Sequence, residues 1–294
     1  MNLQRRQAGP DPGRGGRDGP EADGDGTVGK ALAVLDRVAG HGRPVRFSEL
    51  LEDSPFPKAT LYRLLQTLVN QRMLAYEPDG GTYGPGLRLV RMAHLAWRQS
   101  SLAPIARPHL DALSADVGQT VHLAQLDGGS VLYVDKRDAT RPVAMFSEAG
   151  KVGPAYCTGV GKAILAHLPE ASLDSVLGQQ SWHRFTAATI TTPAAMRDEL
   201  AEIRRAGFAI DREEHEAGII CIAMPVLSAG GHAQGAVSVT GTTTRLSLTD
   251  LIGLAPRLRA AAAAITRDLR DWRFPHEGRN VAPGDRTDAA EERT

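Results

Sequence analysis

Residues 57–68 read Pro-Lys-Ala-Thr-Leu-Tyr-Arg-Leu-Leu-Gln-Thr-Leu. The leucines from Leu61 to Leu68 are spaced i, i+3, i+4 and i+7, which predicts a helix with one apolar stripe. Pro57 suits the first position of such a helix, where no amide proton is needed. The opposite side carries no acidic residue and consists of Ala59, Tyr62, Arg63 and Gln66, flanked by Lys58 and Thr60. We therefore expect one face of this helix to be buried and the other to be available for a partner.

The segments on either side of this helix predict a winged helix-turn-helix over residues 28–85. Apolar residues recur at helical spacing from Val28 to Ala39, and Gly40, Gly42 and Pro44 end that pattern. A brief helix, a turn and a hairpin complete the module, at residues 47–52, 53–56 and 73–83, with the hairpin turn at 77–81. Three helices followed by a hairpin, with a tight turn between the second and third helices, define this fold.

The composition of this module favours DNA as its partner. Between Ser54 and Tyr76 there are three basic residues and no acidic one. Once the leucines are buried, the polar face of the third helix can enter a major groove, which is about 12 Å wide. We expect the DNA contacts to come from Lys58, Thr60, Tyr62, Arg63, Gln66 and Arg72. A helical module for dimerisation or protein docking, with a solvated polar face, is the alternative.

A further helix is expected to link this module to the rest of the chain, over residues 86–103. Leu87, Val90 and Trp97 fall at helical spacing, and the pattern ends near Ser100. A stripe that includes Trp97 predicts pairing with the same helix of a second chain. Packing of the stripe on its own domain is the alternative that the pattern leaves open.

The pattern changes at Pro104 from helices to strands joined by hairpins. Apolar strands are separated by Gly-rich turns, and helices collect near the ends of the segment. This order predicts an α+β domain over residues 104–270, with an antiparallel sheet of the kind found in sensor domains. Three finer expectations are a third strand at 143–146, a surface loop at 211–216 whose first residue, Asp211, could instead face a pocket, and one long final helix at 249–269.

Length and charge limit what the chain can be. Its 294 residues suffice for about two domains, and 34 basic residues balance 34 acidic ones. The balance is uneven, because residues 54–110 hold seven basic and two acidic residues. No apolar stretch reaches the roughly 18 to 20 residues of a membrane span, and the polar N-terminal residues hold no hydrophobic run of signal-peptide type, so we expect a soluble, cytoplasmic protein without a membrane partner. A polar, Gly-rich composition predicts a disordered arm at 1–27 and a disordered tail at 271–294.

The sequence offers little for catalysis. It has no Gly-x-Ser-x-Gly elbow and no His-Glu-x-x-His motif, and the stretch Gly159-Val-Gly-Lys162 lacks the Ser or Thr with which a phosphate loop holds Mg²⁺. A Gly-rich turn at a helix start still suits a small anion such as a carboxylate. Cys157 and Cys221 have no ligand spacing with His122 or His215, so neither a metal nor a cofactor is expected. An enzyme that uses Cys221 as a nucleophile is the rival from another class.

Most of the chain resembles the IclR family of transcriptional regulators. Residues 57–68 are similar to the family's recognition helix, and Thr158-Gly-Val-Gly-Lys162 is similar to its effector loop. The spacing Gly207-x3-Asp211-x2-Glu214-x6-Cys221 follows the family signature, and Ser238-Val-Thr-Gly241 follows it in turn.

This resemblance implies a winged helix-turn-helix, a linker helix and a GAF-like effector-binding domain. It implies a non-enzymatic regulator of a catabolic operon, a repressor in preference to an activator, that binds operator DNA as a homodimer or a dimer of dimers. A small organic acid would be the effector, in a pocket lined by Gly159, Val160, Asp211, Ile219, Cys221, Ser238 and Thr240. A metabolic enzyme or a protein-docking co-regulator, with the helix-turn-helix as an interaction module, is the alternative.

Overall fold

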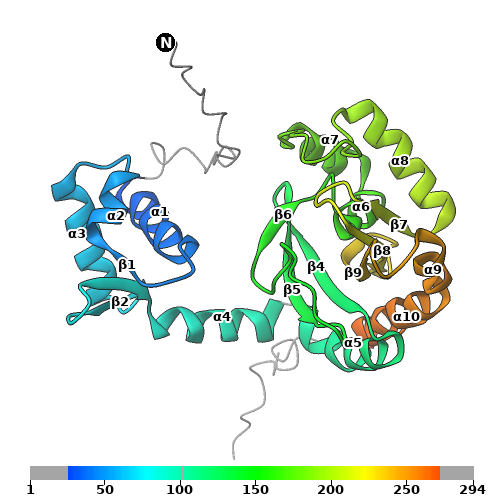
Figure 1. Cartoon of the computed structure of the whole chain (residues 1–294), viewed down its shortest axis with the longest axis horizontal. Helices are drawn as coiled ribbons and strands as arrows, with labels where there is room; N and C mark the ends of the chain where they lie inside the picture. Colours follow the sequence, from blue (N-terminus) through cyan, green and yellow to red (C-terminus); the bar gives the residue numbers. More distant parts are fainter. Residues whose placement is uncertain (1–25, 101, 272–294) are drawn as a thin grey trace, which may run out of the picture. The chain divides into compact units, whose positions relative to one another are not determined.

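The computed structural model describes residues 26–100 and 102–271, so the ends expected to be disordered, 1–27 and 271–294, lie almost wholly outside the described residues. The chain forms two compact units, each with a core of its own, and the boundary falls between Leu95 and Ala96 (Figure 1). This boundary lies within α4 (Leu87–Ser100), the helix in the segment expected as a linker. In neither described range is a helix both long and apolar enough to cross a membrane.

Within the described residues, the first unit combines short helices with a small antiparallel sheet. Its elements are α1 (Gly26–Gly40), β1 (Val45–Arg46), α2 (Phe47–Glu52), α3 (Lys58–Asn70), β2 (Leu74–Glu77) and β3 (Thr82–Pro85). The strands lie in the order β1-β3-β2, so the expected hairpin gains a short strand, β1, that the sequence did not reveal. The expected winged helix-turn-helix is confirmed.

The leucine stripe of α3 forms the centre of the core of this unit. All four leucines are buried, against apolar residues of α1 and α2 and against Tyr83 of the wing. Burying one leucine side chain contributes about 1.5–3 kcal/mol, so the stripe fixes α3 and leaves its polar face outward. Pro57 stands just before the helix, which begins at Lys58, and so caps it instead of forming its first residue.

The helix α4 starts directly behind the wing. The guanidinium of Arg88 donates to the carbonyl oxygen of Gln71, 3.0 Å away, and so ties the start of α4 to the end of α3. Leu87 and Val90 are exposed in this chain. The side chain of Trp97 lies outside those that the structure describes, and pairing of this stripe with a second chain stays a prediction.

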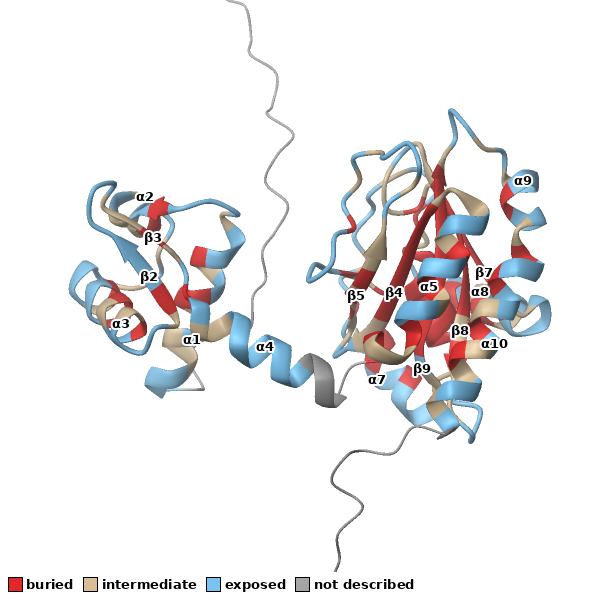
Figure 2. Cartoon of the chain, turned by 90° about the horizontal axis from the view of Figure 1, so that it is seen from below, coloured by how far each residue is buried: buried red, intermediate tan, exposed pale blue. Residues whose placement is uncertain are grey.

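A six-stranded antiparallel sheet organises the second unit (Figure 2). Its strands are β4 (Thr120–Asp127), β5 (Ser130–Arg137), β6 (Val152–Pro154), β7 (Ala209–Arg212), β8 (Ile219–Leu227) and β9 (Ala233–Thr242), in the spatial order β6-β5-β4-β9-β8-β7. One face is covered by α5 (Ala103–Val117), α9 (Leu248–Gly253) and α10 (Ala255–Asp271), and the other by α6 (Gly159–Leu165), α7 (Glu170–Gly178) and α8 (Pro193–Ala206). Because alternate residues of a strand face opposite sides, each face has its own apolar core. The expected α+β class is confirmed.

Three finer expectations for this unit are wrong. Residues 143–146 form no strand and lie in the loop between β5 and β6. The final helix is divided into α9 and α10, since α9 starts at a capping box of Ser247 and Asp250 and ends at Gly253, and α10 starts after Leu254. The run 211–216 is not a surface loop, because it starts within β7 and Glu214 is buried as well as Asp211.

Candidate functional site

The register of the sheet brings predicted pocket residues from several strands onto one face. Asp211 of β7 lies opposite Cys221 of β8, which in turn lies opposite Thr240 of β9. Two residues away on β9, Ser238 lies opposite His122 of β4. Residues directly opposite each other in an antiparallel sheet share a face. These side chains therefore gather on the side of the sheet that α6 covers.

The Gly-rich turn into α6 closes over this row of side chains. Thr158 caps the helix, and its Oγ1 accepts a hydrogen bond from the amide of Gly161 at 3.3 Å. Gly159 packs so closely on Cys221 that an added Cβ would collide with the sulfur, and the Gly159 amide hydrogen-bonds the thiol. A Cβ at Gly161 would collide with the backbone of Ala155. Two amides that were expected to hold an anion thus have partners within the protein.

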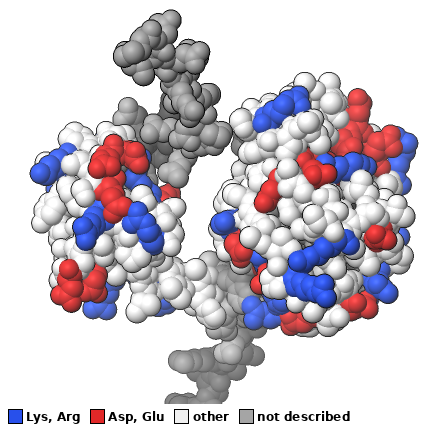
Figure 3. Space-filling model, viewed as in Figure 1, with Lys and Arg blue, Asp and Glu red and all other residues white. Residues whose placement is uncertain are grey.

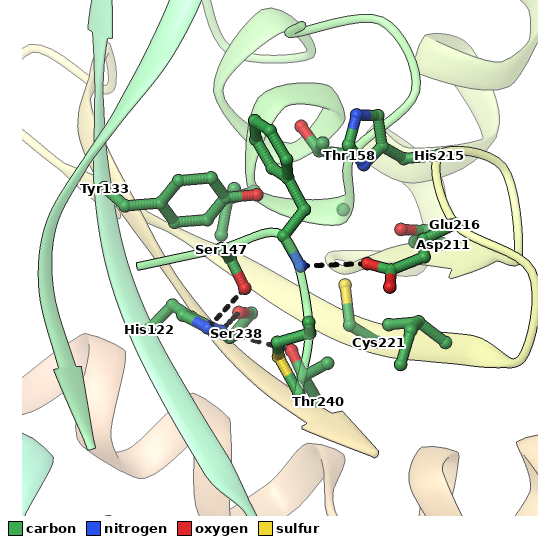
Figure 4. Close-up of a pocket in the computed structure, with 15 residues that line it drawn as sticks. His122, Tyr133, Ser147, Thr158, Asp211, His215, Glu216, Cys221, Ser238 and Thr240 are labelled. Atoms are coloured by element: carbon green, nitrogen blue, oxygen red, sulfur yellow. Dashed lines mark hydrogen bonds between the residues drawn. The ribbon is translucent and has the colours of Figure 1, made fainter. Parts of the chain in front are cut away.

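A cavity lies between this turn and the sheet (Figure 4). It is lined by every residue that the resemblance implied, namely Gly159, Val160, Asp211, Ile219, Cys221, Ser238 and Thr240. The lining also includes residues that the sequence did not assign to it, among them His122, Tyr133, Ser147 and His215. The open space is about 30 Å³, which is room for roughly two water molecules. That these residues bind an effector stays a prediction.

At the floor of the cavity, His122 connects three hydroxyl groups. Its Nε2 lies 2.9 Å from Ser147 Oγ, and its Nδ1 lies 3.4 Å from Ser238 Oγ and 3.3 Å from Thr240 Oγ1. Burial lowers the pKa of His122 to about 3, so the ring is neutral, with one nitrogen as donor and the other as acceptor. The one sign in the sequence that His122 could belong to the cavity is its place among the apolar residues of a strand.

Asp211 supplies an acid group to the wall of the cavity. Its Oδ1 accepts a hydrogen bond from the amide of Glu214 at 2.8 Å. Burial raises the pKa of this carboxyl to about 7. Near neutral pH a large fraction of Asp211 therefore keeps its proton and can donate a hydrogen bond to an acceptor in the cavity.

Beside the cavity, Lys162 forms a buried ion pair that the sequence did not reveal. Its Nζ lies 2.5 Å from Oε1 of Glu214 and 2.9 Å from Oε1 of Glu199 in α8. The Lys162 side chain is fully buried, and the second oxygen of Glu214 is buried without a hydrogen-bond partner among the residues that the structure describes. The partners of Lys162 lie 37 and 52 residues away in the sequence, which is why local patterns gave no sign of the pair.

In the first unit, the polar face of α3 is accessible. Lys58, Tyr62 and Arg63 are exposed, and Thr60 is half-buried. A groove of about 620 Å³ runs from this face to the wing and is lined by Lys58, Ala59, Tyr62, Phe47, Tyr76, Gly81 and Tyr83. Basic and acidic side chains are interspersed on the visible surface of both units (Figure 3), so this side of the protein carries no continuous field of one sign.

Two of the six expected DNA contacts stand apart from the others. Gln66 is half-buried, and its side chain hydrogen-bonds that of Tyr83. Arg72 follows the C-terminal end of α3, in the left-handed conformation with a φ of 57°, whereas Lys58 begins the helix. At a rise of 1.5 Å per residue, Lys58 and Arg72 are about 20 Å apart along the helix axis. They can therefore serve opposite ends of one interface but not one base pair.

The chemistry of the cavity suits binding more than catalysis. Among the residues that the structure describes, no group of three His, Cys, Asp or Glu side chains could hold a metal ion. Burial, together with the charge of Asp211, raises the pKa of the Cys221 thiol far above its usual value. A nucleophilic cysteine needs a lowered pKa and a base beside it, and Cys221 has the opposite setting.

Comparison with known families accounts for both units. The IclR helix-turn-helix domain matches residues 27–78, and the C-terminal domain of the bacterial transcriptional regulator IclR matches residues 94–267. The chain belongs to the IclR family. The resemblance seen in the recognition helix and in the signature around Asp211 is thereby confirmed.

Individual IclR-family proteins are similar over nearly their whole length. The regulator XynR of Escherichia coli K12 is 30% identical over 243 residues, which cover 83% of this chain and 96% of XynR. The acetate operon repressor of Salmonella typhimurium is 28% identical and covers 81% of this chain and 87% of its own. An IclR homolog from Microbacterium hydrocarbonoxydans, solved in complex with 4-hydroxybenzoate, has a TM-score of 0.72 at 25% identity and covers 84% of this chain and 100% of its own.

These relatives decide between the function classes. The named IclR-family relatives are DNA-binding transcriptional regulators and not enzymes. The expectation that this chain is a regulator without enzymatic activity is therefore confirmed, and the rival interpretation of an enzyme built on Cys221 is set aside.

Replacing Gly159 with alanine is expected to lower the free energy of unfolding by about 1–3 kcal/mol, because the new methyl group collides with the Cys221 sulfur. Urea denaturation followed by circular dichroism measures the loss. The double variant Gly159→Ala/Cys221→Ala should recover most of it, since the sulfur is gone. Gly178→Ala is the matched control, because an added Cβ there meets nothing within 4 Å. Equal losses for Gly159→Ala and Gly178→Ala would contradict the tight contact.

Replacing Asp211 with asparagine is expected to make the stability of the protein less dependent on pH. Between about pH 4 and pH 7 the unfolded chain has lost the Asp211 proton, whereas the folded protein, with a pKa of about 7, retains it. The stabilisation from this proton is complete below about pH 4 and is lost as the pH rises through about 7. Asparagine cannot titrate but still accepts from the Glu214 amide.

The measurement is the difference in free energy of unfolding between Asp211→Asn and the unsubstituted protein, from urea denaturation at several pH values. The difference should move in favour of the variant as the pH rises from about 4 to about 7, and then level off. A difference that is constant over this range would show that the pKa of Asp211 is not raised.

Proposed function

We propose that this IclR-family regulator represses a catabolic operon and that a small organic acid, bound in the second unit, controls its affinity for DNA. The observation that carries the proposal is the cavity in which a titrating carboxyl, two hydroxyls and the apolar Ile219 face one another. The name of the Salmonella relative, an acetate operon repressor, supports repression. The 4-hydroxybenzoate held by the Microbacterium homolog supports an organic acid as effector.

On the DNA side, α3 would lie in the major groove. Thr60, Tyr62, Arg63 and Gln66 would meet base edges or phosphates, and Lys58 and Arg72 would contact the DNA backbone. The support is the exposed, acid-free face of α3 and the groove that joins it to the wing. A homodimer, or a dimer of dimers, would read half-sites about 10 bp apart or a multiple of that distance.

On the effector side, the cavity offers hydrogen-bond donors without a fixed positive charge. The proton of Asp211 and the hydroxyls of Ser238 and Thr240 can each donate to a carboxylate. Ile219 forms an apolar wall beside them. An effector changes DNA occupancy only through its different affinity for the DNA-competent and incompetent arrangements, typically about 1–3 kcal/mol.

The test is a thermal-shift screen of small carboxylic acids, repeated in the presence of the DNA upstream of the gene. The proposal expects at least one acid that raises the melting temperature and changes the affinity for this DNA in a gel shift. Ser238→Ala should lose the response to the acid and keep DNA binding, whereas Ser172→Ala, on the exposed side of α7, should keep both. Specific DNA binding that no acid alters would reject the effector, and absence of DNA binding would favour the protein-docking alternative.

A further inference from the structure

The loop between β5 and β6 enters the cavity. Its residues Met145, Phe146 and Ser147 line the cavity together with residues of the sheet and of α6. Ser147 is buried, and Figure 4 shows its hydroxyl pointing at the His122 ring, where Oγ and Nε2 are 2.9 Å apart. A polar atom of the protein itself thus occupies the polar floor of a site that has almost no open space left.

The same loop is fastened to the opposite wall of the cavity. The amide of Phe146 donates to Oε2 of Glu216 at 3.0 Å, and the Phe146 ring packs edge-on against His215 with 4.9 Å between ring centres. Phe146 is nevertheless 39% exposed, whereas Ser147 is buried. The loop is therefore held by a few separate contacts and not by strand pairing. Such contacts can be exchanged without unfolding the sheet.

The chemistry of His122 defines what can replace Ser147. Its Nδ1 is paired with the hydroxyls of Ser238 and Thr240 of the sheet, so the position that departure of Ser147 would free is the one at Nε2. A neutral ring offers at Nε2 either one proton or one lone pair, depending on the tautomer. A hydroxyl group pairs with both forms, because it can donate and accept, whereas a carboxylate pairs with only one. The position that Ser147 Oγ occupies is thus suited to an uncharged hydroxyl.

We propose that Ser147 is an internal substitute for a hydroxyl group of the effector, so that the effector is a hydroxy acid whose hydroxyl replaces Ser147 Oγ on His122 Nε2. This inference rests on the proposed control by an organic acid and assigns its class. The carboxylate of the effector lies toward Asp211, and its hydroxyl hydrogen-bonds Nε2 of His122. Because the open space is about 30 Å³, binding moves the segment 145–147 out of the cavity.

The test compares acids that differ by one hydroxyl. Isothermal titration calorimetry is run with lactate and propionate, mandelate and phenylacetate, and 4-hydroxybenzoate and benzoate. Within any pair that binds the unsubstituted protein, the hydroxy acid should bind roughly three- to tenfold more tightly than the acid without the hydroxyl. This ratio is the equivalent of one neutral hydrogen bond. A ratio near one would overturn the hydroxyl assignment and leave control by an acid standing. If none of the acids bound, the proposed function would fail, and the hydroxyl assignment with it.

Two substitutions of His122 locate the discrimination. His122→Gln can place a polar atom near the Nε2 position, whereas His122→Asn reaches only the Nδ1 position. The affinity ratio should survive in His122→Gln and fall to about one in His122→Asn, while both variants still bind the acid without a hydroxyl. A ratio that persists in His122→Asn would place the hydroxyl elsewhere and overturn the proposal.

Ser147→Ala tests whether the Ser147 hydroxyl takes the place of an effector hydroxyl. Without this competitor both acids of a pair should bind more tightly by the same factor, roughly three- to tenfold, and their ratio should not change. Amide hydrogen exchange, which needs no ligand, should become faster at residues 145–151 in Ser147→Ala. Ser172→Ala, outside the cavity, should change neither. Unchanged affinity and exchange in Ser147→Ala would show that the loop is not held through His122.

Discussion

Replacing Lys162 with methionine is expected to lower the free energy of unfolding by about 3–5 kcal/mol. The substitution removes the ammonium group that lies 2.5 Å from Oε1 of Glu214, and the Glu214 side chain is 3% exposed. A buried carboxylate without a partner must either stay charged in an apolar surrounding or take up a proton, and both cost free energy. Urea denaturation followed by circular dichroism measures the loss in free energy of unfolding.

Two further variants show that burial decides the size of this loss. Arg197→Ala breaks the exposed ion pairs with Glu170 and Asp174, and exposed pairs contribute at most about 1 kcal/mol. Lys162→Met/Glu214→Gln should recover part of the stability, because the stranded charge is gone and the side-chain amide oxygen can still accept from the backbone amide of Arg212, which donates to Glu214 Oε1 at 3.3 Å. A loss in Lys162→Met no larger than that in Arg197→Ala would mean that Glu214 is solvated in the folded protein.

The double variant Lys58→Ala/Arg63→Ala is expected to reduce the dependence of operator affinity on salt. Each phosphate contact contributes about 0.9 to the slope of log K against log salt. If both side chains lie on phosphates, the slope should fall by about 2 for each half-site, and by about 1 for Arg63→Ala alone. Fluorescence anisotropy with labelled operator at several salt concentrations measures the slope. The loss of affinity should be greatest at low salt.

Arg205→Ala is the matched control for this measurement. Arg205 is an exposed basic residue of α8 in the second unit, so its removal changes the net charge by the same amount as one of the two substitutions. The slope should remain unchanged in this variant. If Lys58→Ala/Arg63→Ala also left the slope and the affinity unchanged, the N-terminal half of α3 would not be part of the DNA interface.

The sequence predicted those parts of the fold that local patterns determine. The leucine spacing from Leu61 to Leu68 placed α3, because a stripe at helical spacing has one way to be buried. The apolar run of β8 lies between turns, and a continuous run of this kind suits a strand with both faces covered. The winged module and the antiparallel sheet followed from such elements and from the short turns between them.

Contacts between distant segments could not be predicted in this way. His122 and Ser147 lie 25 residues apart, and His122 and Thr240 lie 118 apart, so no spacing rule joins them. The apolar residues 143–146 suggested a strand, but a segment that fills a cavity needs the same apolar side chains. The charges of 211–216 suggested exposure, because nothing near them in the sequence shows a partner for a buried carboxylate. The cation that pairs with Glu214 comes from α6, 52 residues away. In each case the partner, and not the local pattern, determines the burial.

The four residues from Asp211 to Glu214 connect the wall of the cavity to the helices behind it. Asp211 accepts from the Glu214 amide, and the Glu214 carboxylate holds Lys162 of α6, which also pairs with Glu199 of α8. Opening at any one of these contacts leaves a buried charged or polar group without its partner, so we expect this wall of the cavity and the two helices to open together. A molecule bound against Asp211 therefore raises the cost of local opening throughout this unit, by RT ln(1 + [L]/Kd). Occupancy of the cavity can thus be read from the hydrogen exchange of α8, a helix that contributes no residue to the cavity lining.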